Sequence, residues 1–188
     1  MDLIQPDAFW AEMSVCEHFV QIYDADDMFL DTLAGFISGG LADGHAAVVI
    51  ATPAHRHALD RRLAALGHEP VSARARDQFI SLDAEATLAK FMVAGWPDKA
   101  LFAETVLEIL EPLARQGRKV RAFGEMVALL WAQGDHDATI RLEHLWHQLC
   151  HEQSLALFCA YPKIGFTEAP AESIAGVYLA HSKVYASH

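Results

Sequence analysis

The sequence predicts an α/β fold in which a mainly parallel, five-stranded sheet lies between two layers of helices. Short apolar runs typical of buried strands alternate with segments in which apolar residues recur at helical spacing. Several runs are apolar throughout, as expected for strands that are covered on both faces. Strands that alternate with helices in this way form parallel sheets through right-handed crossovers.

Two of the five expected strands are marked most clearly, because residues 46–51 and 155–160 are continuous runs of apolar side chains. The others rest on shorter runs of apolar and aromatic residues. The predicted strands are residues 17–23, 46–51, 78–82, 119–123 and 155–160.

Helices are expected between these strands. Pro53 suits a first helical turn, and Gly44 and Gly67 suit positions just after helix ends. The predicted helices are residues 6–13, about 29–41, 53–66, 84–94, 99–115, 125–132, 136–152 and 172–182. No repeat, low-complexity tract or linker interrupts the chain, so we expect one domain over residues 1–188.

Composition excludes several classes of protein. The chain has 25 acidic and 14 basic side chains, a formal net charge of -11, which repels nucleic-acid phosphates and anionic membranes. No apolar run approaches the ~20 residues of a membrane-spanning helix. Three widely spaced cysteines and a start without a signal-peptide pattern fit a reducing compartment. We therefore expect a cytoplasmic protein that binds neither nucleic acid nor membrane directly.

The turn after the first strand argues against nucleotide hydrolysis. Phosphate-binding α/β proteins place glycines, a lysine and a hydroxyl there. Residues 23–28 read Tyr-Asp-Ala-Asp-Asp-Met, with three carboxylates and neither glycine nor lysine. Carboxylates beside a phosphate replace attraction with repulsion. We interpret the aspartates as caps of the following helix, with direct ligand contact as the alternative.

Ligands of parallel sheets bind beyond the carboxyl ends of the strands, which indicates where to look for a site. Arg121 and Glu125 offer a charged pair near that crevice, or an internal salt bridge that fixes the turn. His18, within the first strand, is either a core residue or a ligand contact. The candidate ligand-binding residues are His18, Tyr23, Asp24, Thr52, Arg121, Glu125 and Tyr161.

A metal site is conceivable but is not required by the spacing of the residues. Thiolates and imidazoles are zinc ligands, and one set of them is chemically reasonable. That set is Cys16, His18, Cys159 and His181. Their separation in the sequence says little about their distance, so the sequence alone assigns no metal.

Catalytic signatures are missing from the sequence. We find no glycine-flanked serine elbow and no cysteine at a helix start, and no motif for a cofactor, so we expect neither an enzyme nor a bound cofactor. His144, His147 and His151 share one helical face, opposite the apolar face of the same helix. We expect these three side chains, like His55, to be solvated.

Six segments together resemble the MEDS family, sensory domains named for methanogens, methylotrophs and the regulator of dichloromethane dehalogenase. The most specific is residues 120–131, Val-Arg-Ala-Phe-Gly-Glu-Met-Val-Ala-Leu-Leu-Trp. The others are His18 and Tyr23 with the acidic turn, residues 47–55, residues 91–98, the pair Leu142 and Glu143, and residues 159–162. The resemblance covers about residues 17–182.

The resemblance implies a role in signalling, in domains joined to histidine kinases or DNA-binding modules and proposed to sense small organic molecules. It also implies a fold distantly related to RecA and KaiC-type ATPases, here with a degenerate phosphate loop. We recognise no kinase or helix-turn-helix segment in the chain. The signal would therefore pass through a partner, such as a histidine kinase or transcription regulator, through a homodimer, or by sequestration.

These observations leave three functional hypotheses. The first is a sensor that binds a small, weakly charged organic molecule in a crevice at the strand ends, lined by Tyr23, Thr52, Glu125 and Tyr161. The second is a divergent metal-dependent hydrolase with Glu125 as general base. The third is a protein-interaction module whose acidic surface binds a basic partner while the crevice stays free of ligand.

Overall fold

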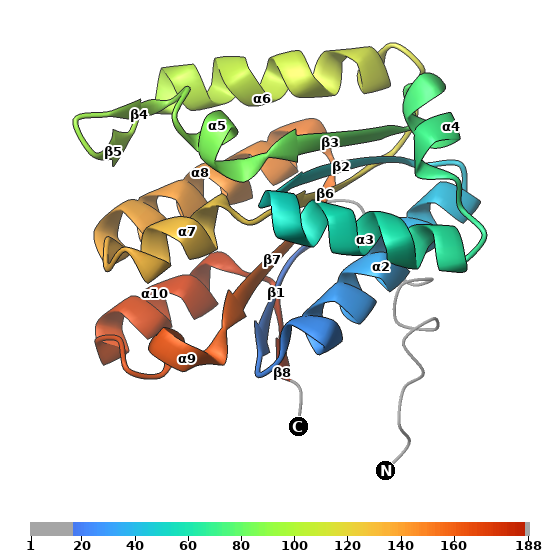
Figure 1. Cartoon of the computed structure of the whole chain (residues 1–188). Helices are drawn as coiled ribbons and strands as arrows, with labels where there is room; N and C mark the ends of the chain where they lie inside the picture. The colour runs from blue at the N-terminus through green and yellow to red at the C-terminus, as the bar shows by residue number, and fades with distance from the viewer. Residues whose placement is uncertain (1–16, 187–188) are drawn as a thin grey trace.

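A six-stranded parallel sheet forms the centre of the domain in our computed structural model, which describes residues 17–186 (Figure 1). The strand order is β3-β2-β6-β7-β1-β8, and all neighbours in this sheet are parallel. The strands are β1 (His18–Tyr23), β2 (Ala46–Ala51), β3 (Phe79–Asp83), β6 (Val120–Gly124), β7 (Ala156–Pro162) and β8 (Lys183–Ala186). The predicted fold class is confirmed, with one strand more than expected.

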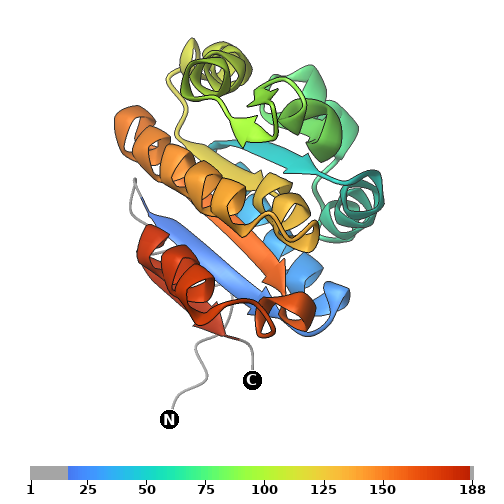
Figure 2. The same ribbon diagram turned by 90° about the vertical axis from the view of Figure 1, so that its left-hand side faces the viewer.

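Helices cover both faces of the sheet (Figure 2). Helices α2 (Asp26–Ala42), α3 (Pro53–Ala65) and α4 (Pro70–Ala75) contribute buried residues to the core of one face. The core of the other face draws on α5 (Ala84–Leu88), α6 (Lys99–Ala114), α7 (Met126–Ala132), α8 (His136–Gln153), α9 (Lys163–Phe166) and α10 (Ala171–Ala180). The sheet therefore separates two apolar cores.

Strand β7 shows how the sequence feeds both cores. Successive strand side chains point to opposite faces of a sheet. Ala156, Phe158 and Ala160 accordingly belong to the core beneath α2 and α3. The intervening Leu157, Cys159 and Tyr161 belong to the core beneath α7, α8 and α10. Every one of these six side chains is buried, which explains why the strand is apolar throughout.

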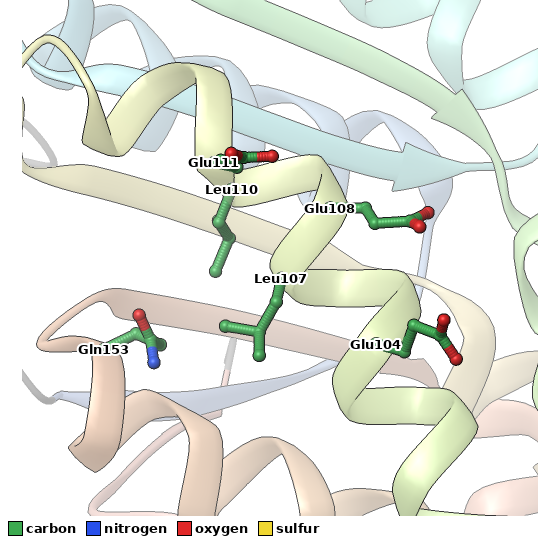
Figure 3. Close-up of a pocket in the computed structure, with 6 residues that line it drawn as sticks. All are labelled: Glu104, Leu107, Glu108, Leu110, Glu111 and Gln153. Atoms are coloured by element: carbon green, nitrogen blue, oxygen red, sulfur yellow. The ribbon is translucent and has the colours of Figure 1, made fainter.

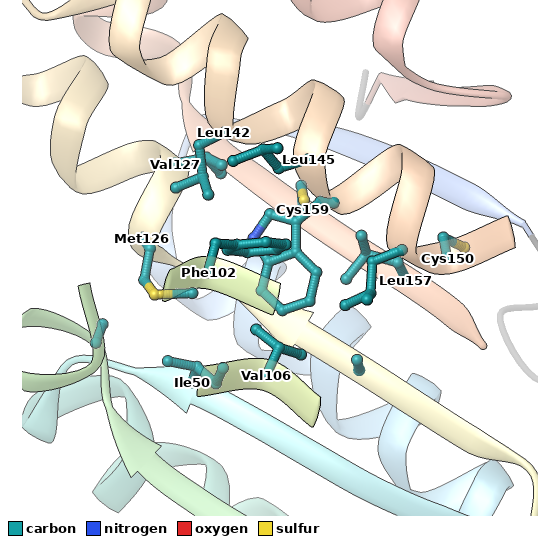
Figure 4. Packing of buried hydrophobic residues seen from close by; sticks show 14 of the residues in the cluster. Ile50, Phe102, Val106, Met126, Val127, Leu142, Leu145, Cys150, Leu157 and Cys159 are labelled. Carbon is teal, nitrogen blue, oxygen red and sulfur yellow. The ribbon is translucent and has the colours of Figure 1, made fainter. Parts of the chain in front are cut away.

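Aromatic rings fill the core beneath α2. Phe158 stacks on Phe19 with a centroid separation of 4.5 Å and also meets Phe36 and Phe123, at 5.8 and 5.3 Å. On the opposite face, the rings of Phe102 and Trp146 meet edge to face at 5.1 Å. Figure 4 shows Phe102 among other buried residues of this core, such as Val106 and Leu157. Offset and edge-on aromatic contacts of this kind add stability beyond the area they bury.

The structure corrects several predicted elements. The helix expected over residues 84–94 ends at Leu88, and the chain then forms a hairpin of β4 (Met92–Val93) and β5 (Trp96–Pro97). Ala94 and Gly95 have φ of 50° and 80°, a pair of left-handed residues that suits a tight hairpin and is incompatible with a helix. The predicted helix over residues 6–13 lies outside the described residues.

The C-terminal end also differs from prediction. The helix expected over residues 172–182 ends at Ala180, and the extended residues that follow lead into β8 beside β1. Helices α4 and α9 were not predicted either. Strand β8 and helices α4 and α9 are each four to six residues long, which is too short for a hydrophobic periodicity to be recognised. No helix within residues 17–186 is both long and apolar enough to cross a membrane.

Replacing Phe158 with alanine should destabilise the fold by about 3–5 kcal/mol, because a fully buried ring would leave a cavity among four other aromatic rings. Urea denaturation followed by circular dichroism measures this loss. The control is Leu179→Ala, since Leu179 is 84% exposed and should change stability by no more than about 0.5 kcal/mol. Equal effects of the two substitutions would contradict the described core.

Candidate functional site

Glu125 is the centre of a polar cluster at the carboxyl ends of β2 and β6. Its Oε2 accepts a hydrogen bond from the Thr52 amide at 2.7 Å, and Oε1 lies 2.8 Å from His55 Nδ1. The Thr52 hydroxyl donates to Oε1 at 3.4 Å. Thr52 and Pro53 begin helix α3, so the carboxylate also lies at the positive end of that helix. The predicted strand-end residues Thr52 and Glu125 are thus brought together.

His55 and Tyr23 complete this strand-end cluster, which we define as Tyr23, Asp26, Thr52, His55 and Glu125. The hydrogen bond to Glu125 raises the pKa of His55 against the opposing effect of burial, and Asp26, 3.7 Å from Nε2, acts in the same direction. Burial raises the pKa of Tyr23, as do the nearby carboxylates of Asp26 and Glu125. The side chains of His55 and Glu125 remain 16% and 10% exposed, so solvent reaches both.

His55 is half-buried against Glu125, not solvated as predicted. The signal that could have shown this is its position in the chain. His55 lies in the first turn of a helix that follows a buried strand, where its side chain can reach back to the carboxyl edge of the sheet.

The acidic turn between β1 and α2 does not cap the helix as predicted. The N-cap residue is Ala25, and no side chain caps it. The carboxylates pair with cations of neighbouring elements instead. Arg62 of α3 donates to Asp27 at 2.6 Å and to Asp31 at 2.8 Å, and Lys163 lies 3.2 Å from Asp24. Asp26 and Asp27 do lie in the first turn, where the helix dipole favours negative charge.

Arg121 does not lie with Glu125. It is the second residue of β6, and its guanidinium donates to the Phe36 carbonyl of α2 at 2.8 Å and lies 3.6 Å from Asp43. Asp43 follows the C-terminus of α2, at the opposite edge of the sheet from Glu125. Arg121 and Glu125 therefore do not form the predicted charged pair. Arg121 contacts α2 instead, and Glu125 contacts α3.

His18 and Tyr161 do not belong to the strand-end cluster either, because both side chains face the layer of α8 and α10. There they contribute to a second polar group, the buried cluster, which we define as His18, Glu143, Cys159, Tyr161 and His181. All five residues are buried, and Glu143 and Cys159 have no exposed surface. Glu143 Oε2 lies 3.4 Å from Nε2 of both His18 and His181. Cys159 Sγ lies 3.7 Å from the same oxygen and 3.4 Å from His18 Nε2.

Strand register and helix spacing bring these side chains together. Cys159 pairs with Val20 across β7 and β1, so His18, two residues earlier on β1, points to the same face as Cys159 and Tyr161. Glu143 lies on the buried face of α8, one residue after Leu142. His181 follows the C-terminus of α10, and there Ser182 bonds both backbone groups of His18, at 2.7 and 3.0 Å.

Burial dominates the electrostatics of this cluster. It lowers the pKa of His18 well below the usual value, helped by the imidazoles of His181 and His147. It raises the pKa values of Cys159 and Tyr161 well above their usual values, and the carboxylate of Glu143 adds to both shifts. The Tyr161 hydroxyl donates a short hydrogen bond to Glu143 Oε1.

Three of the four candidate zinc ligands are therefore in one place, since ligand atoms of His18, Cys159 and His181 lie with one of Glu143 within 4.8 Å of one another. Cys16 lies outside the described residues. Glu143 was not among the candidate ligands chosen from the sequence. The signal that could have found it is the position of a carboxylate within the apolar stripe of the 136–152 helix, beside Leu142 and Trp146. His147, predicted to be solvated, is half-buried, with its ring 5.9 Å from that of His18.

A model of the MEDS family, the methanogen/methylotroph, DcmR sensory domain, matches residues 17–182. The chain belongs to the MEDS family. The match spans every described strand except β8, and it includes both clusters. Membership agrees with the resemblance found in the sequence, and it assigns this MEDS domain to a family of sensory domains.

A solved structure with the same fold is a KaiC-like protein from the hyperthermophilic archaeon Pyrococcus horikoshii. It aligns with a TM-score of 0.63 and 12% sequence identity, over 92% of this chain and 72% of the other. At this identity the likeness concerns the fold alone. No curated protein matches this chain significantly.

A surface hollow of about 460 Å³ lies away from both clusters, between α6 and the end of α8 (Figure 3). Leu107 and Leu110 form its apolar floor, and Gln153 closes one side. Three carboxylates, those of Glu104, Glu108 and Glu111, rim it. None of the residues predicted to bind a ligand lines this hollow.

Glu125→Gln should lower the pKa of His55, because the hydrogen bond to Glu125 is the largest cause of its upward shift. A raised folded-state pKa means that the pair stabilises the fold fully below about pH 6.5, the usual value of histidine, and loses this effect as pH rises through the pKa of His55. NMR titration of the imidazole Hε1 resonance measures the shift. The matched control is Glu111→Gln, at an exposed position of α6. An unchanged His55 pKa in both variants would contradict the described contact.

Proposed function

We propose that this MEDS domain senses a small organic molecule at the strand-end cluster and passes the signal to a protein partner. Membership of a sensory family supports the sensing role. The convergence of Tyr23, Thr52, His55 and Glu125, from three different parts of the chain, supports the location. Polar groups that converge at the carboxyl edge of a parallel sheet are the usual setting for ligands in this type of fold.

The chemistry of the cluster favours a neutral or cationic ligand. The carboxylates of Asp26 and Glu125 repel an anion, and the usual phosphate-binding turn is replaced here by carboxylates that already bind Arg62 and Lys163. A hydroxyl, amide or amine on the ligand would donate to Glu125 in place of His55 or Thr52. The slight exposure of His55 and Glu125 suits a small molecule.

Signal transmission would follow from the position of Glu125. Its backbone amide bonds the Ile50 carbonyl of β2, its side chain bonds the start of α3, and helix α7 begins at the next residue. A ligand that takes the place of both His55 and Thr52 at Glu125 would release α3 from the start of α7. The ligand shifts this equilibrium only if it binds one of the two arrangements better. The proposed partner is a signalling protein such as a histidine kinase or transcription regulator.

We propose binding rather than catalysis at this cluster. A metal-dependent hydrolase with Glu125 as general base would need metal ligands near that carboxylate. Among residues 17–186, the group of side chains arranged to hold a metal is the buried cluster, and Glu125 does not belong to it.

Thermal unfolding in the presence of short-chain alcohols, amides and amines tests this proposal. A true ligand at 100 times its Kd should stabilise the protein by about 2.7 kcal/mol, and Glu125→Gln should abolish the effect. Glu111→Gln, which alters only an exposed pair on α6, should retain it. Tight magnesium-dependent binding of ATP that is lost in Glu125→Gln would overturn the proposal, and a panel without a single binder would favour an interaction module instead.

A further inference from the structure

Four of the six separations among the ligand atoms of the buried cluster match the edges of a metal coordination tetrahedron. Zinc bonds of about 2.0–2.3 Å place tetrahedral ligand atoms about 3.3–3.7 Å apart. Three of the separations, from Glu143 Oε2 to both histidines and from His18 to Cys159, are 3.4 Å, and that between Cys159 and Glu143 is 3.7 Å. The remaining pairs lie within 4.8 Å.

The tautomer of His181 leaves a lone pair directed into this cluster. Its Nδ1 lies 2.7 Å from the Val177 carbonyl, which only accepts, so Nδ1 carries the proton and donates it. In the neutral ring, Nε2 is then an acceptor, and it has no hydrogen-bond partner although it is buried. Nε2 faces another acceptor, Glu143 Oε2, at 3.4 Å. Two buried acceptors repel each other unless a proton or a cation lies between them.

The charge of the cluster matches a divalent cation. Glu143 bonds or faces Tyr161, Cys159, His18 and His181, and no lysine or arginine is among these partners within the described chain. An isolated buried carboxylate is costly. One carboxylate and one thiolate would neutralise a divalent ion without any other charged group, since both imidazoles are neutral ligands.

Neighbouring groups already hold two of the ligands in the required orientation. The Tyr161 hydroxyl occupies Oε1 of Glu143 and leaves Oε2 free to face the other donors. The Val177 carbonyl fixes the ring of His181 through Nδ1. Metal-binding histidines and carboxylates are commonly oriented by such outer hydrogen bonds.

We propose that this MEDS domain binds one zinc ion, or a similar borderline-soft divalent ion, through His18 Nε2, Glu143 Oε2, Cys159 Sγ and His181 Nε2. Mixed thiolate and imidazole donors in a tetrahedral arrangement select zinc over magnesium or calcium. Binding replaces the S–H bond of Cys159 with a sulfur–metal bond and releases the proton to solvent. Because four protein groups fill the tetrahedron and all are buried, the ion would hold β1, β7, α8 and the end of α10 together.

Metal analysis of the untagged full chain, purified without chelators, tests the proposal first. About one zinc per chain is expected. Chelator-treated protein titrated with Co²⁺ should develop the visible bands of a tetrahedral ion and the near-ultraviolet charge-transfer band of a thiolate ligand. This experiment needs no variant, so a folding failure cannot obscure it. Folded protein that contains no metal and responds to neither Zn²⁺ nor Co²⁺ would overturn the proposal. A proton between His181 and Glu143 would then explain their contact.

Two substitutions assign the ligands. Cys159→Ser should remove the charge-transfer band and weaken zinc binding more than 100-fold, whereas Cys150→Ser, at a buried cysteine outside the cluster, should retain both. Tyr161→Phe should weaken zinc binding about 10–100-fold with the cobalt spectrum preserved, because Tyr161 orients a ligand without binding the ion.

A surface site is the competing explanation for bound metal, and two further variants separate it from the buried one. His144→Gln and His151→Gln alter exposed histidines of α8 and should leave the zinc content and the cobalt spectrum unchanged. Metal that persists in Cys159→Ser and disappears in either surface variant would overturn the assignment. Glu125→Gln should retain the metal, so this test is independent of the ligand proposed at the strand ends.

Discussion

The complete burial of the central strands on both faces is the constraint on which the rest of this domain depends. Strand β7 has helices above and below it, so each of its side chains must either be apolar or find a polar partner in a helix. Phe158 meets the first requirement through its contacts with other aromatic rings. Cys159 and Tyr161 meet the second through Glu143 of α8. A polar residue in a buried strand therefore requires a polar partner from the helix that faces it.

The two polar clusters differ in their contact with water, and this difference separates their chemistry. Glu125 lies at the edge of the sheet, with a backbone amide, a hydroxyl and an imidazole as partners and with solvent within reach. Glu143 lies between the sheet and α8, without exposed surface. A ligand can exchange with the partners of Glu125, whereas the partners of Glu143 are fixed by packing. The first site suits reversible sensing and the second suits a permanently held ion.

The turn that follows β1 is acidic where other proteins of this architecture bind phosphate. In nucleotide-binding proteins with such a turn, an anion satisfies the start of the first helix. Here the first turn of α2 contains Asp26 and Asp27, and Arg62 from α3 bonds both Asp27 and Asp31. The negative charge favoured at that helix terminus is therefore supplied by the chain itself. These ion pairs tie α2 to α3, two of the three helices that contribute to the core on that face of the sheet.

Local sequence determined most of the architecture, because the central strands are long apolar runs and the main helices have clear periodicity. The limits of β2 agree with prediction, and those of α3 and α6 agree within one residue. Short elements such as β8 and the hairpin at Ala94 were not predicted, because they depend on pairing with distant strands or on a left-handed turn. The strand-end position of Thr52 and Glu125 followed from the general behaviour of parallel sheets.

Only the tertiary structure decided which polar residues meet. His18, Cys159 and His181 were recognised in the sequence as chemically compatible, but more than 140 residues separate His18 from Cys159. Their proximity results from the parallel pairing of β1 with β7 and from the bonds of Ser182 to His18. Glu143 joins them because α8 crosses the same face of the sheet. Residue type sets what a side chain can bind, whereas strand order and register set which side chains it meets, and no local pattern encodes that order.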